Sequence, residues 1–256
     1  MNEHAAGGVP AVELMDVAVR YEIPTEKIVS FKEYVLHRLT SRVEYRELWA
    51  LRSLSLTVQP GEVFGIVGRN GAGKSTLLKV VSRVMHPTSG RLIVRGRLAP
   101  LLELGAGFHP DLTGMENIYM NGAILGYPKA SLGARIDDIV DFAELPGFID
   151  APLRTFSSGM KARLGFAVAT LFRPDVLVID EILDVGDVGF RQKCSERIRD
   201  FRSRGTTILL VSHDPQTLES NCDRVAWLEH GEVVAVGCPS EVLPRFLEAM
   251  TQKGRA

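Results

Sequence analysis

The 256-residue sequence predicts an α/β fold with a core of parallel or mixed sheet, an antiparallel β lobe and a helical subdomain. Three observations indicate it. An apolar run at 63–67 leads through a glycine-rich loop into a helical pattern at 75–84. Strand patterns occupy both ends of the chain, and helical patterns fill 113–145 and 158–171 between them. With 45% hydrophobic residues, a chain of this length can bury one sizeable core.

The first part of the chain is rich in strand patterns. Residues 11–21 contain many Val and Leu, and residues 51–58 alternate Leu or Val with polar residues. A Pro-Gly-Glu turn at 60–62 leads into the apolar run, and two further strands are expected at 91–96 and 98–104. Together these strands supply the β lobe and the start of the core sheet.

The second half of the chain mixes helices with buried strands. Gly205 follows an amphipathic pattern at 191–204 and is placed to end that helix. A hairpin is expected at 224–237, with His-Gly in its turn. The other expected elements are buried strands at 175–180 and 206–214 and a helix at 240–251.

Composition excludes several classes of function. The net charge of −1 argues against a strong global field, so no nucleic-acid partner is expected. Cys194, Cys222 and Cys238 are widely spaced, odd in number and outside any metal-binding spacing, which indicates reduced thiols in a cytoplasmic protein. No run of about 18 apolar residues occurs, so no transmembrane helix is expected, and the N-terminus lacks a signal-peptide pattern.

The glycine-rich loop contains the full P-loop pattern Gly68-x-x-x-x-Gly73-Lys74-Ser75 between a strand and a helix. Its backbone N–H groups are expected to cradle phosphates, with Lys74 at the β- and γ-phosphates and the Ser75 hydroxyl on Mg²⁺. An ordinary glycine-rich turn would need neither the lysine nor the hydroxyl. The expected nucleotide contacts in this loop are Gly68, Arg69, Asn70, Gly71, Ala72, Gly73, Lys74, Ser75 and Thr76.

A second signal is a pair of carboxylates at the end of the buried strand at 175–180. Asp180 is placed to hold Mg²⁺, and Glu181 to act as the general base for an attacking water. Alone, such a pair would usually be a solvated strand end. A third signal comes at the start of the helix at 158–171, where Ser157, Ser158 and Gly159 form a potential anion site or a plain serine cap.

In this order the motifs resemble the ATP-binding subunit of ABC transporters, and the resemblance covers residues 11–245. "FSSGM" stands where that family has its signature Leu-Ser-Gly-Gly-Gln. The resemblance implies that Asp187 lies at a dimer interface and that His213 contacts the γ-phosphate. It also implies an ABC ATPase fold that binds ATP and Mg²⁺, in which Lys74, Glu181 and His213 are catalytic. Two copies would pair head to tail, with ATP between the P-loop of one and Ser157-Ser158-Gly159 of the other.

The sequence departs from the family pattern in three places. Ser158 replaces a glycine and Met160 a glutamine of the signature. No glutamine stands where the family has its glutamine loop, where Glu103 is the nearest polar residue, so that role stays unassigned. The third departure is an insertion of about 25 residues after the first strand.

The insertion is expected to form an amphipathic, mildly basic helix, with Phe31, Val35 and Leu39 at helical spacing. It could lie at a membrane interface or on a partner, or simply cover the β lobe. It also leaves open which aromatic residue stacks on adenine. Tyr21 is favoured by its place near the end of the first strand, with Tyr45 and Trp49 as rivals, and core packing is an equal alternative for Trp49.

The insertion, the run at 100–122 and the "FSSGM" stretch together resemble the ATPase subunit of O-antigen and teichoic-acid exporters. That resemblance implies a lipid-linked polysaccharide as substrate, an integral membrane permease as partner and a peripheral position on the cytoplasmic face of the inner membrane. Residues around Phe108, His109 and Glu116 would border the groove that receives the permease. Some members carry a further C-terminal carbohydrate-binding domain. The resemblance therefore implies that this chain is either a short member of the family or a truncated one.

Three alternatives remain open: a soluble ABC ATPase acting on ribosomes or DNA, an exporter of a drug or lipid, and a non-hydrolysing module. A single domain without heptads argues against the first, and intact Lys74, Asp180, Glu181 and His213 argue against the last. The expected organisation is one ABC ATPase domain over 1–256. Its parts are 11–67 and 91–103 with the β lobe, the inserted helix at 24–48, the helical subdomain at 108–172, the rest of the core at 173–238, and a C-terminal helix and tail at 239–256.

Overall fold

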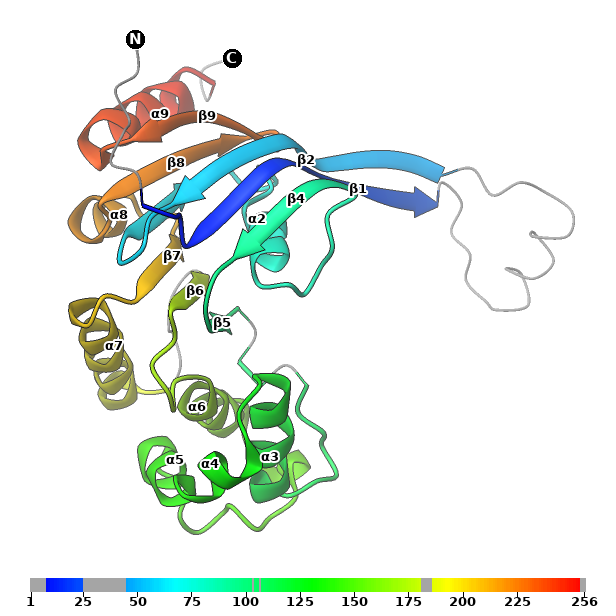
Figure 1. Ribbon diagram of the computed structural model, residues 1–256, viewed down its shortest axis with the longest axis vertical. Coiled ribbons are helices and arrows are strands. Elements are labelled where there is room, and N and C mark those ends of the chain that lie inside the picture. Colours follow the sequence, from blue (N-terminus) through cyan, green and yellow to red (C-terminus); the bar gives the residue numbers. More distant parts are fainter. Residues whose placement is uncertain (1–7, 25–44, 103, 106, 181–185, 254–256) are drawn as a thin grey trace, which may run out of the picture.

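The computed structural model describes residues 8–24, 45–102, 104–105, 107–180 and 186–253 (Figure 1). These residues form the expected α/β arrangement. Figure 1 shows two sheets at one end of the molecule and a helical subdomain at the other. Within the described ranges, every helix is too short or too polar to cross a membrane.

Three antiparallel strands, in the order β2-β1-β4, form the β lobe among the described residues. Both strands of the β1–β2 pair are longer than the sequence predicts, because their pairing continues to Pro24 and Tyr45. In Figure 1 this two-stranded extension projects from the body of the molecule. The bounds are Val12–Pro24 for β1, Tyr45–Val58 for β2 and Ser89–Val94 for β4.

This extension shows that part of the prediction of an inserted helix at 24–48 is wrong. Pro24 and residues 45–48 belong to strands, because Ile23 pairs with Arg46 and Glu22 with Glu47 in an antiparallel ladder. The rest of the insertion, with its Phe31, Val35 and Leu39, lies outside the described residues.

The core sheet runs in the order β5-β6-β7-β3-β8-β9 within the described part of the chain. Its first five strands are parallel, and β9 is antiparallel to β8, so the sheet is mixed as predicted. β3 lies between β7 and β8, so the loop after β3 and the ends of β6 and β7 open on one edge of the sheet. The bounds are Val63–Val67 for β3, Leu98–Leu101 for β5, Val176–Asp180 for β6, Thr207–Val211 for β7, Arg224–Glu229 for β8 and Glu232–Gly237 for β9.

Helices cover both faces of the core sheet. One hydrophobic cluster joins the β lobe, helix α2 and one face of the sheet, with Phe64 and Leu78 fully buried. A second cluster packs α7, α8 and α9 on the opposite face, around Phe190 and Trp227. Helix α2 spans Lys74–Val81, α7 Val188–Ser203, α8 Pro215–Asn221 and α9 Pro239–Lys253.

The helical subdomain has its own core, centred on the buried Ile118, Leu132 and Leu164. Its first helix begins with a capping box, in which Thr113 and Glu116 each accept from the other's backbone N–H. The subdomain contains α3 at Gly114–Ile124, α4 at Lys129–Gly133, α5 at Ile136–Ala143, a 3₁₀ turn at Leu153–Thr155 and α6 at Ser158–Ala169.

Candidate functional site

The glycine-rich loop connects a fully buried strand to a helix. All five residues of β3 are buried, and α2 begins at Lys74 after Gly73, which has a φ of +104°. The loop is also tied to the hairpin beyond it, because the Gly231 N–H donates to the Ala72 carbonyl at 2.9 Å. The loop is therefore held at both ends and from the side.

Two glycines in this loop have no room for a side chain. A Cβ on Gly68 would lie 2.3 Å from the carbonyl oxygen of Leu228, and one on Gly73 would lie 2.5 Å from that of Ala50. Gly71 has a φ of +81° but faces open space. Glycine is thus required by close backbone approach at two positions and by backbone conformation at the third.

Lys74 lies across the mouth of this loop. Its ammonium group donates to the carbonyl oxygens of Gly68 at 2.7 Å and of Arg69 at 3.1 Å. The side chain therefore curls back over the loop and places its charge among the backbone groups that a phosphate would approach.

A pocket of about 520 Å³ opens beside the loop. It brings together Lys74, Ser75 and Asp180 from α2 and the end of β6. A hydroxyl and a carboxylate oxygen at one site are the kind of ligands that Mg²⁺ takes, so these residues fit a magnesium ion. Among the described residues, the lining consists of Tyr21, Leu48, Trp49, Ala50, Asn70, Gly71, Gly73, Lys74, Ser75, Thr76, Asp180 and Val211.

Two of the three candidate aromatic residues lie in this pocket. The Tyr21 hydroxyl is 3.4 Å from the Thr76 hydroxyl, and its ring packs against the core. Trp49 is 37% exposed, with the Arg20 guanidinium 5.7 Å from its ring centroid. Tyr45 is not among the lining residues and lies further out on β2.

Of the two other residues expected to act in hydrolysis, Glu181 and His213, the structure describes His213. His213 is exposed and stands two residues beyond the end of β7. The next residue, Asp214, caps α8 and accepts from the Thr217 hydroxyl and two backbone N–H groups, which lower the pKa of its carboxyl group. Glu181 lies outside the described residues.

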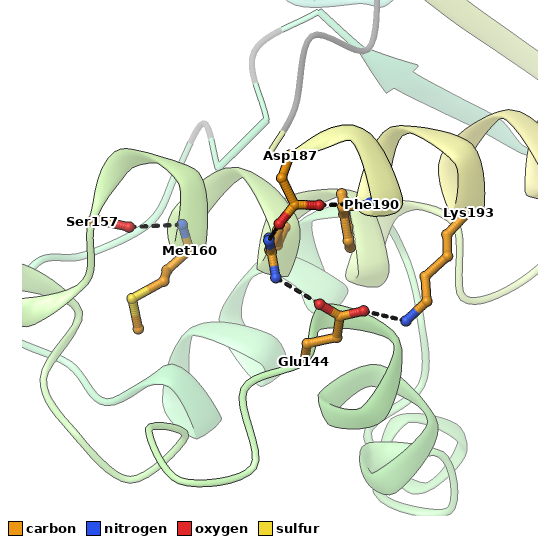
Figure 2. Close-up of polar contacts among 7 residues, drawn as sticks. Glu144, Ser157, Met160, Asp187, Phe190 and Lys193 are labelled. Carbon is orange, nitrogen blue, oxygen red and sulfur yellow. Dashed lines mark hydrogen bonds and ion pairs between the residues drawn. The ribbon is translucent and has the colours of Figure 1, made fainter.

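The signature stretch begins α6 as expected. Ser157 is the N-cap, and its hydroxyl accepts from the Met160 N–H at 3.2 Å (Figure 2). Ser157 and Ser158 are exposed, and Gly159 is partly exposed. None of these residues is among the lining of the pocket beside the P-loop. The described chain thus presents the P-loop pocket and the signature as separate surfaces.

Asp187 caps α7 and is bound to α6. One carboxylate oxygen accepts from the Phe190 N–H at 3.0 Å, and the other lies 2.5 Å from the guanidinium of Arg163 (Figure 2). The backbone bond from Phe190 is the larger cause and the Arg163 charge a smaller one of a lowered pKa at this carboxyl group. The sequence points to Asp187 but gives no sign of this pairing.

A second pocket, of about 650 Å³, is not predicted by the sequence. It lies between the C-terminal end of α2, β5 and the helical subdomain. Val84 and Ile124 line it and are 69% and 66% exposed. Among the described residues, its charged lining residues are Lys79, Arg83 and Arg97. The signal in the sequence was weak, because single aliphatic residues near helix ends are common.

Phe108, His109 and Glu116 do not line this second pocket. Phe108 packs on the core of the helical subdomain, and Glu116 belongs to the cap of α3. The His109 N–H donates to the side chain of the buried Asn117 at 2.7 Å. These residues shape the first turn of α3, and their contacts are internal to the subdomain.

A family model described as "ABC transporter" matches residues 51–184 of this chain. Among curated relatives, the O-antigen export system ATP-binding protein RfbB of Klebsiella pneumoniae is 43% identical over 94% of this chain and 99% of its own length. The protein of the same name from Myxococcus xanthus is 48% identical over 94% of this chain, which spans only 56% of that longer relative. The teichoic acids export ATP-binding protein TagH of Enterococcus faecalis is 46% identical over 77% of this chain and 44% of its own length.

Solved structures show the same fold. An ATP-binding subunit of an ABC transporter superposes with a TM-score of 0.70 at 23% identity, covering 92% of this chain and 93% of the other. A dimeric ATP-binding cassette bound to ADP and Pi superposes with a TM-score of 0.67 at 20% identity, covering 89% and 98%. These likenesses confirm the predicted α/β fold of an ABC ATPase.

Proposed function

Because this chain belongs to the ABC transporter family, we propose that it is the ATP-hydrolysing subunit of a polysaccharide exporter. The observation that supports ATP hydrolysis is the P-loop pocket, where Lys74, Ser75 and Asp180 line one cavity of about 520 Å³. The export assignment is supported by relatives named for O-antigen and teichoic-acid export that match most of this chain.

ATP is proposed to bind with its phosphates in the loop from Gly68 to Thr76 and its adenine near Tyr21. The loop N–H groups and Lys74 would stabilise the phosphate charge. Ser75 and Asp180 would hold Mg²⁺, which neutralises charge on the phosphoryl oxygens. Glu181 is proposed to take the proton of the attacking water, and His213 to contact the γ-phosphate.

A second copy of the chain is proposed to complete each ATP site. The exposed Ser157 and Ser158 and the partly exposed Gly159 lie at the start of α6 and are not among the lining of the P-loop pocket of the same chain. A helix N-terminus favours negative charge, so this surface suits the γ-phosphate held by a partner copy. In this head-to-tail pair, Asp187 would also lie at the interface.

The proposed membrane partner is an integral permease. The 650 Å³ pocket supports this, because it combines the exposed Val84 and Ile124 with three basic side chains on its wall. A permease segment with an apolar side chain and acidic neighbours would match that lining. The subunit would then sit on the cytoplasmic face of the inner membrane, with a lipid-linked polysaccharide as the transported substrate.

The test is to isolate a trapped complex with Glu181→Gln from the native host. This variant should bind ATP, dimerise and stop turning over, so it should hold the permease during extraction in mild detergent with ATP. A multi-span permease encoded beside sugar-transferase genes is the expected companion. A permease of another type would point to a drug or lipid exporter. Recovery with ribosomes or DNA would overturn the transport assignment.

A further inference from the structure

Arg163 lies on α6, between the signature at its start and the residues Gly186 and Asp187 that lead into α7. Its side chain is only 18% exposed, although it carries a charge. One end of the guanidinium lies 2.8 Å from Glu144, and the other lies 2.5 Å from Asp187 (Figure 2). The group also lies over the ring of Phe190, 5.1 Å from its centroid. Arg163 therefore joins two carboxylates that come from different segments.

The backbone at Gly186 and Asp187 is shaped around this side chain. Gly186 has a φ of +74°, and a Cβ there would lie 3.1 Å from the Nε atom of Arg163. Directly after it, Asp187 uses one oxygen for the cap of α7 and the other for Arg163. A side chain at 186 would be strained by its φ and would crowd the guanidinium.

The other end of the network reaches the helical subdomain. Glu144 ends α5 with a φ of +59°, and its carboxylate also pairs with Lys193 of α7. The Lys193 hydrogen bond is the largest cause of the lowered pKa of the Glu144 carboxyl group. Two cations and two carboxylates thus join α5, α6 and α7 at one point (Figure 2).

We infer that Arg163 is a positioning residue, which holds Asp187 in a fixed place relative to the signature and so sets the rate of ATP hydrolysis without touching ATP. The inference rests on the proposed function, in which Ser157-Ser158-Gly159 and Asp187 face the partner copy. Ser157 starts the helix that carries Arg163, and Asp187 starts α7. The Arg163–Asp187 pair connects the middle of α6, six residues after Ser157, to the start of α7.

The chemistry requires arginine and not merely a positive charge. A guanidinium is planar, offers donors on two sides and stacks on an aromatic ring, whereas an ammonium is a point charge. The Asp187 side chain is 66% exposed, so its ion pair adds little to global stability. We therefore expect Arg163→Lys to disturb the position of Asp187 more than the stability of the protein.

The experiment compares Arg163→Lys, Asp187→Asn and the double variant in the full chain reconstituted with its permease. Steady-state kcat and KM for ATP are measured together with equilibrium binding of ATP to the isolated subunit. Hydrogen exchange of the Phe190 amide, which donates to Asp187, gives a local readout that needs no activity. The matched control is Arg204→Lys, because Arg204 pairs with Asp200 at 2.9 Å in a 64% exposed position at the far end of α7.

The expected result is that Arg163→Lys keeps ATP binding, lowers kcat roughly 10- to 100-fold and speeds exchange at Phe190. The double variant should lose no more than the more affected single variant, because both changes remove one interaction. Unchanged exchange at Phe190, or losses that multiply in the double variant, would overturn the inference. If the wild-type chain hydrolyses no ATP, the proposed function fails, but the exchange data still decide whether Arg163 holds Asp187.

Discussion

The ammonium group of Lys74 donates to the carbonyl oxygen of Gly68 at 2.7 Å, across the loop that separates the two residues. The same group reaches the Arg69 carbonyl at 3.1 Å. The lysine is therefore pre-positioned by the loop, and little side-chain entropy remains to be lost when it meets a phosphate.

Lys74→Ala should abolish tight ATP binding while leaving the fold intact. The substitution removes a positive charge from the phosphate site and keeps a residue with high helix propensity at the start of α2. Binding is measured by equilibrium titration with a fluorescent ATP analogue, and folding by circular dichroism. Lys79→Ala, one and a half turns along the same helix, is the control. Retained affinity in Lys74→Ala would exclude its proposed contact with phosphate.

Gly68→Ala and Gly71→Ala should behave differently, although both lie in the loop. The added methyl group at Gly68 would meet the Leu228 carbonyl at 2.3 Å, so the loop or β8 must move. We expect a loss of ATP binding and about 1–3 kcal/mol of stability. At Gly71 the space is open, and the cost is the backbone strain of a positive φ, about 1 kcal/mol. Urea unfolding of both variants tests this, and equal losses would contradict it.

The P-loop and its surroundings were predictable because their signals are local. A buried strand, a glycine loop and a helix follow one another, and the His230-Gly231 turn of the last hairpin has two residues with positive φ, as its sequence suggests. Ser157 as a helix cap and Gly205 as a helix end have equally local causes.

Most features that the sequence did not predict depend on contacts between distant segments. The pairing of Arg163 with Glu144 and Asp187 spans 19 and 24 residues, and nothing in its neighbourhood indicates it. The extended β1–β2 ribbon was mistaken in part for a helix, because residues 45–48 alternate too briefly to reveal a strand. Helix α8 is an exception: it was not predicted, although Asp214 followed by Pro215 is a local signal for a helix start.

Thiol labelling should distinguish the three cysteines. Cys194 and Cys222 are buried, which raises the pKa of each thiol to about 12, whereas Cys238 is exposed. At pH near 8 the two buried thiols therefore carry almost no thiolate and are shielded. A thiol reagent should label Cys238 quickly in the folded protein and all three in denaturant. A Cys238→Ser variant should show no fast phase, and a fast phase in it would contradict the assignment.

Glu144→Gln should destabilise the protein at neutral pH and lose this effect in acid. The pKa of Glu144 is lowered in the folded state, chiefly by the Lys193 hydrogen bond. A carboxyl group whose pKa is lowered in the folded state stabilises the folded protein at pH values above its ordinary pKa. This contribution disappears as the pH falls through the pKa of the folded state. The melting temperatures of wild type and variant should therefore converge on acidification. Glu219→Gln on α8 is the control, and a gap that persists in acid would contradict the prediction.

Tyr21 and Tyr45 should differ in their importance for nucleotide binding. Tyr21 lines the P-loop pocket with its hydroxyl 3.4 Å from that of Thr76, whereas Tyr45 lies outside the lining on the projecting ribbon. Loss of an aromatic stacking partner costs about 1–3 kcal/mol per base. We expect Tyr21→Leu to weaken ATP binding by roughly 5- to 150-fold and Tyr45→Leu to leave it unchanged.

Trp49 provides the internal comparison for this prediction. It lines the same pocket, but the Arg20 guanidinium lies 5.7 Å from its ring centroid. If adenine stacks on Tyr21, Trp49→Leu should change ATP affinity less than Tyr21→Leu. Binding of ATP and of inorganic triphosphate is measured for both variants, because triphosphate has no base to stack. A loss of ATP affinity confined to Trp49→Leu would show that adenine stacks on Trp49 of β2 and not on Tyr21 of β1.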